Sequence, residues 1–318
     1  MTDLFDRRPL SPMLIGADGP AFDSPDYLYE LKLDGIRCVA YLDPAGHVEL
    51  LNKRALNVTA IYPELRGICK QVKARCILDG EVTVFVDGKP NFAQIQRRAL
   101  MSNHTKIRIA AQQAPVNFTA FDILYLDGTE LPGHPLEERK HALNLAVSDS
   151  PALAVSRVIE EHGTALYRLT EQQGLEGIVA KRRGSLYYPG KRTKEWIKCK
   201  NMKDDDFVVL GYIQKHGGVT SIIVGQYQGE RLLYRGHVTL GVSSEGMRRI
   251  EAMERLPGPP CAVPAGNKDA VWVVPELVCT VKYMELTANG SMRQPVFKSL
   301  RDDKRPTECK TAPPHSSE

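Results

Sequence analysis

The sequence has few of the features that mark secreted or membrane-embedded proteins. No apolar run in its 318 residues approaches the roughly 20 residues that a membrane-spanning helix needs. The amino-terminal residues 1–9 carry several charges instead of the apolar core of a signal peptide. We therefore expect a soluble, intracellular protein that has no membrane partner.

Cysteine is scarce and is poorly arranged for metal or disulfide chemistry. The chain has seven cysteines, an odd number, and no two of them are spaced as C-x-x-C. The spacing disfavours a zinc site, and the odd number disfavours a disulfide framework. We expect most of the seven to be small residues of the protein core.

Acidic residues are almost missing from one segment, residues 181–203. This segment contains nine lysines and arginines and a single carboxylate, Glu195, so its net charge is +8. The whole chain carries only +4, which leaves −4 for the remainder. A merely solvated surface would more usually mix both signs. The local cationic stripe therefore predicts a polyanionic partner that binds at one place.

The length of the chain predicts two domains, because a single hydrophobic core seldom grows beyond about 250–300 residues. The sequence changes character near residues 201–206, after which short apolar runs alternate with glycine-rich turns. We expect a helix at residues 244–253 and strands at residues 207–212, 221–226, 231–237 and 270–284. These strands predict a small all-β barrel over residues 201–310. Residues 311–318 are rich in Pro, Ser and Thr and are expected to be disordered.

Residues 1–200 combine strands with helices, which predicts an α+β fold. Four prolines in residues 1–26 indicate an extended lead-in. Asn91 is expected to cap a helix on which Arg97 and Arg98 are exposed, and Gly174 is expected to end another helix. Helices are also expected at residues 61–72, 135–147 and 164–173, and strands at residues 47–51, 77–85, 116–125, 176–181 and 194–200.

Residues 27–41 contain a lysine between two carboxylates. At the two-residue period of a strand, Glu30, Lys32 and Asp34 share one face, while Gly35 permits a sharp turn before Arg37. Taken alone, this string favours a solvated hairpin with charges paired across its turn. The same geometry would suit a lysine nucleophile that attacks a phosphate.

Other charged residues on predicted strands favour the interpretation of Lys32 as a nucleophile over the hairpin interpretation. A mixed set of acidic and basic side chains from several strands is what metal-assisted phosphoryl or nucleotidyl transfer requires. Glu81 and Glu176 could instead be surface carboxylates, Phe121 an ordinary core residue and Trp196 a packing residue. The converging set consists of Lys32 with Asp34 and Arg37, Glu81, Glu176, and the pair Lys198 and Lys200.

Six short motifs in order resemble those of the covalent nucleotidyltransferases, and within them the ATP-dependent DNA ligases. The resemblance covers nearly the full chain. The R-x-P-x-F form of the last motif looks most like the ligase domain of bacterial D-type end-joining ligases, here standing alone without primase-polymerase or nuclease modules. The motifs are KLDGIR at residues 32–37, DGE at 79–81, FDILYLDG at 121–128, EGIVAK at 176–181, WIKCK at 196–200 and RQPVFKSLR at 293–301.

The resemblance implies an adenylation domain of antiparallel sheets with flanking helices at residues 1–200, followed by an OB-fold at residues 201–310. It also implies that Lys32 attacks the α-phosphate of ATP and becomes lysyl-AMP, with Mg²⁺ or Mn²⁺ as the metal. The implied catalytic residues are Lys32, Asp34, Lys198 and Lys200. The implied metal ligands are Glu81 and Glu176. The implied cofactor-binding residues are Glu30, Arg37, Arg54, Glu81, Phe121, Lys181, Arg192, Arg293, Lys298 and Arg301.

Two departures from the family pattern weaken single assignments. Residues 53–56 lack the small residues and glycine that usually surround the arginine at the position of Arg54. Ser299 replaces a frequent glycine of the last motif. The first departure weakens Arg54 as a site residue, and the second concerns only the local turn.

The expected function is the sealing of nicked or broken duplex DNA in repair or end joining. AMP would pass from Lys32 to a 5′-phosphate, and a 3′-hydroxyl would then displace it while the barrel swings about a hinge near residues 200–206. The resemblance implies a monomer in the bacterial cytoplasm, associated with the nucleoid, and an end-binding or repair protein that recruits it. An RNA ligase, a capping guanylyltransferase and a non-catalytic nucleic-acid-binding scaffold remain alternatives. The missing cysteine motif opposes an NAD-dependent ligase.

Overall fold

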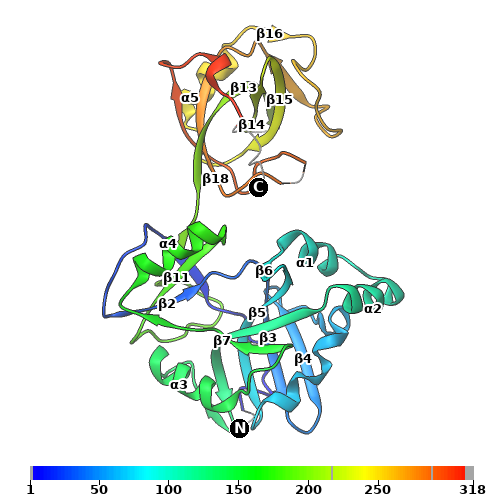
Figure 1. The fold of residues 1–318 in the computed structure, drawn as a ribbon, viewed down its shortest axis with the longest axis vertical. Helices are drawn as coiled ribbons and strands as arrows, with labels where there is room; N and C mark the ends of the chain where they lie inside the picture. Colours follow the sequence, from blue (N-terminus) through cyan, green and yellow to red (C-terminus); the bar gives the residue numbers. More distant parts are fainter. Residues whose placement is uncertain (1–2, 216–217, 288, 312–318) are drawn as a thin grey trace. The chain divides into compact units, whose positions relative to one another are not determined.

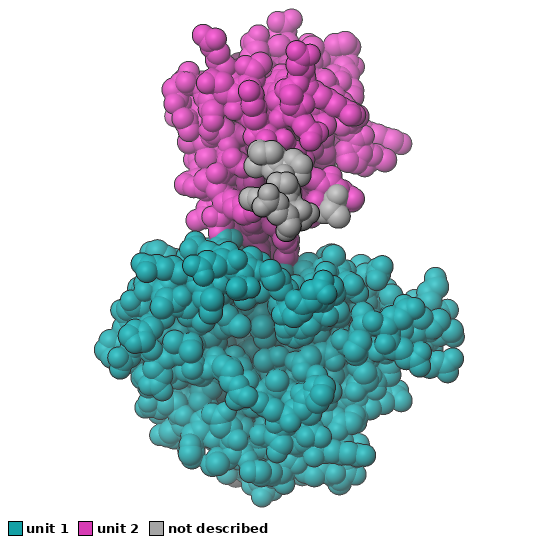
Figure 2. Space-filling model, in the orientation of Figure 1, with its two compact units in different colours: residues 1–201 teal, residues 202–318 magenta. Residues whose placement is uncertain are grey.

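The structure, a computed structural model, describes residues 3–215, 218–287 and 289–311 (Figure 1). It divides into two compact units, unit 1 at residues 1–201 and unit 2 at residues 202–318 (Figure 2). Most of the tail predicted to be disordered, residues 312–318, lies outside the described residues. Within the described ranges, no helix combines the length and the apolar character that crossing a membrane requires.

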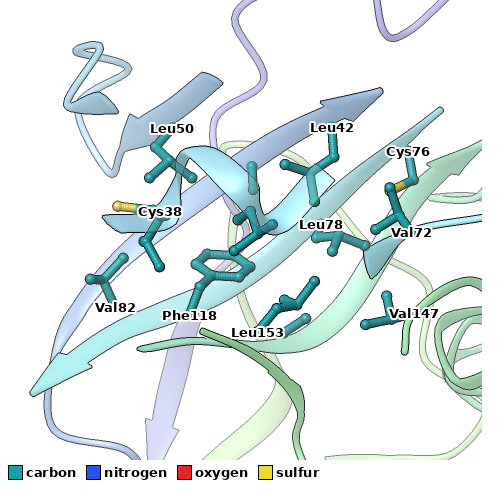
Figure 3. Packing of buried hydrophobic residues seen from close by; sticks show 14 of the residues in the cluster. Cys38, Leu42, Leu50, Val72, Cys76, Leu78, Val82, Phe118, Val147 and Leu153 are labelled. Atoms are coloured by element: carbon teal, nitrogen blue, oxygen red, sulfur yellow. The ribbon is translucent and has the colours of Figure 1, made fainter. Parts of the chain in front are cut away.

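The larger sheet of unit 1 has seven strands and carries the main hydrophobic core. Its order is β4-β3-β5-β7-β8, with β6 paired to β5 and β9 paired in parallel to β7. Figure 3 shows how Cys38, Leu78 and Phe118 from three neighbouring strands meet in this core. The strands are β3 (Ile36–Asp43), β4 (His47–Asn52), β5 (Cys76–Val86), β6 (Lys89–Pro90), β7 (Val116–Leu126), β8 (Thr129–Glu130) and β9 (Leu153–Val155).

Helical segments surround this sheet. Asn91 caps α1 by accepting a hydrogen bond from the Gln94 N–H, as the sequence predicts. Leu136 and Leu143 of α3 are buried against the sheet. The helix expected at residues 61–72 is a 3₁₀ helix, and α2 was not predicted. The segments are η1 (Thr59–Ile61), η2 (Pro63–Gln71), α1 (Phe92–Ala99), α2 (His104–Gln113) and α3 (Leu136–Ala146).

A second sheet of unit 1 has five strands in the order β1-β12-β11-β2-β10. Directly paired residues of neighbouring strands project to the same face, and Val179 pairs with both Glu30 and Lys198. The opposite face carries Tyr29 and Ile178, which pack with residues of α4 (Gly163–Gln173). The strands are β1 (Leu14–Asp18), β2 (Tyr27–Leu31), β10 (Ile159–Glu160), β11 (Gly177–Arg182) and β12 (Arg192–Lys200).

The hairpin interpretation of residues 27–41 is wrong. β2 belongs to the five-stranded sheet and β3 to the seven-stranded sheet, so residues 32–35 cross from one sheet to the other. The segment 1–26 is likewise more than a lead-in, because β1 pairs in parallel with β12. The sequence analysis missed this strand because the prolines around it indicate a loop. Its pairing partner, β12, lies far along the chain.

Arg98 is buried, although the sequence predicted that it is exposed. Its guanidinium binds the Glu64 carboxylate and also donates to the Ile61 carbonyl at 3.0 Å. Arg97 is exposed, as expected. Helical periodicity could not anticipate that a carboxylate from η2 would make burial of Arg98 acceptable.

Unit 2 is a sheet of antiparallel strands with its own core around Phe207 and Phe297. Its order is β15-β14-β13-β17-β16, and β18 pairs with β13 and β19. The strand expected at residues 270–284 is interrupted and forms β17 and β18. The elements are β13 (Lys203–Lys215), β14 (Gly218–Gln228), β15 (Arg231–Val238), α5 (Ser244–Glu251), β16 (Arg255–Leu256), β17 (Ala270–Val273), β18 (Val278–Tyr283), β19 (Val296–Arg301) and η3 (Pro306–Glu308).

Candidate active site

A cavity of about 170 Å³ in unit 1 is lined by residues from both of its sheets. Six of the residues predicted from the motifs lie on its wall: Glu30, Lys32, Arg37, Glu81, Phe121 and Lys181. The remaining lining residues are mostly apolar: Ile15, Leu31, Leu33, Val179 and Trp196. An apolar wall with a few convergent charges is typical of a ligand site.

Lys32 lies directly after β2 and is held at two atoms. Its backbone N–H donates to the Gly177 carbonyl at 2.9 Å, and its Nζ donates to Glu176 Oε2 at 2.7 Å. Glu176 is only 8% exposed, and burial raises the pKa of its carboxyl group, partly offset by the Lys32 cation. The lysine amine therefore has a defined place at the cavity wall.

Gly35 is required for close approach between strands. A Cβ atom at this position would lie 2.3 Å from the Val82 carbonyl oxygen of β5. Gly35 lies at a bend of the chain, as the sequence predicts, and this packing role is added to it. This contact lets the segment that carries Lys32 lie directly against β5, which carries Glu81.

Arg37 is oriented by two hydrogen bonds to one buried carboxylate. Its Nε and Nη2 donate to the two oxygens of Asp79 at 2.9 and 2.6 Å. The hydroxyl of Tyr187 donates to the same carboxylate at 2.6 Å. The guanidinium also lies 5.3 Å from the centroid of the Phe121 ring. Asp79 and Tyr187 therefore position a cation beside an aromatic wall, a role that the motifs alone did not assign to them.

Glu81 lies on β5 directly opposite Arg37 of β3. Burial raises the pKa of its carboxyl group to about 8, although the cations of Lys32 and Arg37 act in the opposite direction. A carboxyl group with this pKa takes up or releases a proton near neutral pH.

The inner end of the cavity contains a buried ionic cluster. Glu30 pairs with Lys140 at 2.5 Å and with Lys181 at 2.9 Å. Burial would raise the pKa of Glu30, but the two ammonium groups lower it below its ordinary value. Burial lowers the pKa of Lys181 to about 8, and its Nζ lies 4.5 Å from the ring centroid of Phe121 and 4.3 Å from that of Trp196.

Lys140 was missed by the sequence analysis. It lies on α3 at helical spacing from Leu136 and Leu143, so its position on the apolar face of that helix was the available signal. A lysine on a buried face needs an opposite charge, and Glu30 supplies it.

Lys198 and Lys200 project from β12 to the face that also carries Glu30 and Lys32. Lys200 pairs with Gly177, the residue after Glu176, and burial together with Lys198 lowers the pKa of Lys200. Lys198 Nζ lies 3.2 Å from Asp18. The two lysines border the cavity without lining it.

Several predicted residues are not among those that line the cavity. Arg54 is exposed in the turn after β4, and Arg192 at the start of β12 donates to the Ile15 carbonyl at 2.8 Å. Arg293, Lys298 and Arg301 belong to unit 2. Their ion-pair partners there are Glu285 at 3.2 Å, Asp204 at 2.7 Å and Asp303 at 2.7 Å, in the same order.

Two family models match the chain over most of its length. The ATP-dependent DNA ligase domain matches residues 20–200, and the ATP-dependent DNA ligase C-terminal region matches residues 215–304. The chain belongs to the ATP-dependent DNA ligases. The order of motifs that starts at Lys32 is thus the order of this family.

Individual relatives agree with this assignment. The multifunctional non-homologous end joining DNA repair protein LigD of Mycobacterium tuberculosis is 31% identical over 318 residues, which are 96% of this chain and 40% of LigD. This chain therefore spans about 40% of the length of LigD. DNA ligase C1 of Mycolicibacterium smegmatis is 31% identical over 332 residues, which are 96% of this chain and 94% of that ligase.

A solved mycobacterial DNA ligase D, in complex with ATP and MES, shares the fold. It superposes with a TM-score of 0.56 at 31% identity and covers 97% of this chain and 99% of its own. The predicted fold class, a nucleotidyltransferase domain followed by an OB-fold sheet domain, is confirmed. The family to which the chain belongs is ATP-dependent.

Proposed function

We propose that the cavity of unit 1 binds ATP and that Lys32 becomes the covalent carrier of AMP. The observation that carries this proposal is the position of the Lys32 amine, 2.7 Å from Glu176, on the wall of a cavity that also contains an aromatic side chain and an oriented arginine. This arrangement places a nucleophile, a proton acceptor and phosphate-binding cations within one site.

The apolar part of the cavity suits the adenine ring. Phe121 offers an aromatic face, and Val179 and Leu31 offer aliphatic walls. Glu30 holds Lys181 at the edge of this region, where its ammonium group can donate a hydrogen bond to a ring nitrogen. Arg37, held by Asp79, then lies where ribose or phosphate oxygens would be.

The proposed chemistry starts with the neutral amine of Lys32. Its nitrogen attacks the α-phosphorus of ATP, a P–N bond forms, the bond to pyrophosphate breaks and pyrophosphate leaves. The amine proton passes to Glu176, whose buried carboxylate is a stronger base than an exposed one. The cations of Lys198 and Lys200 stabilise the negative charge that develops on the α-phosphate.

Two further transfers complete the proposed reaction. An oxygen of the 5′-phosphate at a nick attacks the AMP phosphorus, and the P–N bond to Lys32 breaks. The 3′-hydroxyl then attacks the activated 5′-phosphate, a phosphodiester bond forms and AMP leaves. Each step exchanges one phosphorus bond for another, so no oxidant or further co-reactant is needed.

A divalent metal, Mg²⁺ or Mn²⁺, fits the acidic residues of the site. In the described part of the chain, no group of three or more His, Cys, Asp or Glu side chains could hold a metal ion by itself. Mg²⁺ usually binds one or two carboxylates together with substrate phosphates and water. Glu81 and Glu176 would be these carboxylates, and the metal would neutralise charge on the phosphates.

The biological substrate follows from the relatives as part of the proposal. The printed name of LigD refers to non-homologous end joining and DNA repair. We extend this role to the present chain as a monomeric ligase at the bacterial nucleoid, recruited to nicked or broken duplex by an end-binding protein. Contacts to DNA would be mainly to the backbone, and therefore sensitive to salt.

Incubation with α-labelled ATP and Mg²⁺ tests the proposal. The wild-type chain should acquire a label that survives denaturation, whereas Lys32→Ala should acquire none because the attacking nitrogen is gone. Lys70→Ala, which removes an exposed lysine of η2, is the matched control and should label normally. A label that persists in Lys32→Ala would exclude lysyl-AMP at this residue.

The same labelled enzyme separates the alternatives. Nicked DNA should consume the label and yield sealed strands, while nicked RNA and GTP should not replace DNA and ATP. Sealing of nicked RNA with equal efficiency would indicate an RNA ligase. A chain that binds DNA without acquiring any label would be a nucleic-acid-binding scaffold.

A further inference from the structure

Residues 88–121 contain no carboxylate at all. This span of 34 residues lies between Asp87 and Asp122. At the acidic content of the whole chain, 38 residues in 318, a span of this length would contain about four. The span covers β6, α1 and α2, which follow directly on β5, the strand that carries Glu81.

Four cations of this span are exposed, and we call them the α1–α2 surface: Lys89, Arg97, Lys106 and Arg108. In the described ranges of the chain, none of the four forms an ion pair with a carboxylate. The fifth cation, Arg98, is buried and bound to Glu64. Among the residues that the structure describes, the four exposed cations therefore have no carboxylate partner that would explain them as part of the fold, whereas Arg98 has one.

Cations elsewhere in unit 1 are partnered more often. Among exposed arginines of unit 1, Arg7 binds Glu130 and Arg157 binds Asp149. An ordinary solvated surface also mixes both signs, since like charges without partners repel one another. A group of exposed cations without carboxylates is complementary to a regular polyanion.

We infer that the α1–α2 surface binds the sugar–phosphate backbone of the duplex beside the nick. The inference rests on the proposed function and names a surface for the DNA contacts that this function requires. Figure 1 shows α1 and α2, which follow one another along the chain, at the periphery of unit 1.

The position of this surface predicts which part of the duplex it contacts. Val86 lies five positions after Glu81 on β5, a distance of about 17 Å at the rise of an antiparallel strand. DNA advances about 3.4 Å per base pair, so this length corresponds to about five base pairs. The contacted phosphates should therefore lie about five or more base pairs from the nick, on one of its two arms.

The test compares two double variants of the full chain. Arg97→Ala/Arg108→Ala removes two exposed arginines of the α1–α2 surface. Arg7→Ala/Arg157→Ala removes two exposed arginines that pair with Glu130 and Asp149 elsewhere on unit 1. Both variants change the net charge equally, so any difference reports position and not total charge. Thermal unfolding should be similar for both, because all four side chains are exposed.

The readout is affinity for nicked duplex as a function of salt concentration. Each phosphate contact contributes about 0.9 to the slope of log affinity against log salt. We expect Arg97→Ala/Arg108→Ala to reduce this slope by about 1.8 and to weaken binding roughly tenfold at low salt, with the control unchanged. Labelling of Lys32 by ATP alone should be equal in both variants and the wild type.

Shortened substrates give a second readout. When one arm of the nicked duplex is cut to fewer than about five base pairs, the wild type and Arg97→Ala/Arg108→Ala should bind it equally, since the contacted phosphates are gone. Equal slopes for the two double variants would overturn the inference, as would a defect that does not depend on arm length. Equal slopes are the result expected if the α1–α2 surface binds an acidic protein partner and not DNA. Loss of ATP labelling in the wild type would instead count against the proposed function.

Discussion

The positions of single side chains in this ligase depend on their hydrogen-bond and ion-pair partners. Lys32 is one of many lysines, and its pairing with Glu176 beside Gly177 places its amine on the wall of the cavity. Arg37 is similarly defined by Asp79 and Tyr187. These partners come from other segments of the chain, so mutation of the partners should affect the function of both cations.

The raised pKa of Glu81 predicts a pH dependence for formation of lysyl-AMP. A carboxyl group with a pKa of about 8 is mostly protonated at pH 7 and mostly ionised at pH 9. Only the ionised form can bind the metal, so the ionised fraction and the labelling rate should increase by up to roughly tenfold over this range. Single-turnover labelling with ATP between pH 7 and pH 9 measures this increase.

Glu81→Gln provides the comparison for that experiment. The amide cannot ionise, so the variant should label slowly at every pH and without the increase. Glu130→Gln, which alters an exposed carboxylate paired with Arg7, should keep the profile of the wild type. A full increase that persists in Glu81→Gln would assign the ionisation to a different group.

At the scale of single elements, β11 depends on the glycine at its start. Gly177 has φ of 130°, and a Cβ atom there would lie 2.1 Å from the Cys199 carbonyl oxygen of β12. Its carbonyl accepts the hydrogen bond from the Lys32 N–H. Gly177 therefore determines how closely β11 pairs with β12, and its carbonyl determines the position of Lys32.

Gly177→Ala should destabilise unit 1 and slow labelling of Lys32. The strained backbone and the steric clash together should cost about 2 kcal/mol or more of the free energy of unfolding. Gly184→Ala is the control, since a Cβ atom at Gly184 would contact nothing within 4 Å. Denaturant unfolding and single-turnover labelling measure the two effects. Equal behaviour of the two variants would show that the space around Gly177 can relax.

The elements of unit 1 were predicted with mixed success, for physical reasons. α1 and α4 were predicted because Asn91 and Gly174 are local end signals that need no distant partner. β1 was missed because it depends on β12, which lies far along the chain. The Lys32 segment was misread as a hairpin because local sequence does not show that two consecutive strands join different sheets.

At the scale of the whole molecule, the proposed ATP-binding residues are divided between the two units. Lys32 and its neighbours belong to unit 1, and Arg293, Lys298 and Arg301 belong to unit 2. In unit 2, Arg301 pairs with Asp303, which is itself exposed. If Arg301 orients pyrophosphate, it must exchange this carboxylate for phosphate oxygens during adenylation.

Arg301→Ala should therefore slow the first step of the reaction and leave the last step intact. Labelling of Lys32 by ATP should decrease by about tenfold or more, since a charge-assisted contact to the leaving group is lost. Sealing of a nick that already carries AMP on its 5′-phosphate should be unchanged, because no pyrophosphate takes part. Arg231→Ala, at an exposed arginine of β15, is the control. Equal loss in both assays would place Arg301 in DNA binding instead.

The amino-acid sequence alone was enough to predict the family, the fold class and the residues that carry charge. Motif order, caps and periodicity are local properties of the chain, and they persist whatever the chain folds against. Tertiary structure decided which charges meet. Lys140 joins Glu30 and Lys181, Arg98 is buried with Glu64, and Arg54 remains outside the cavity. These outcomes depend on contacts between distant strands and helices, where burial makes an unpaired charge costly and so selects its partner.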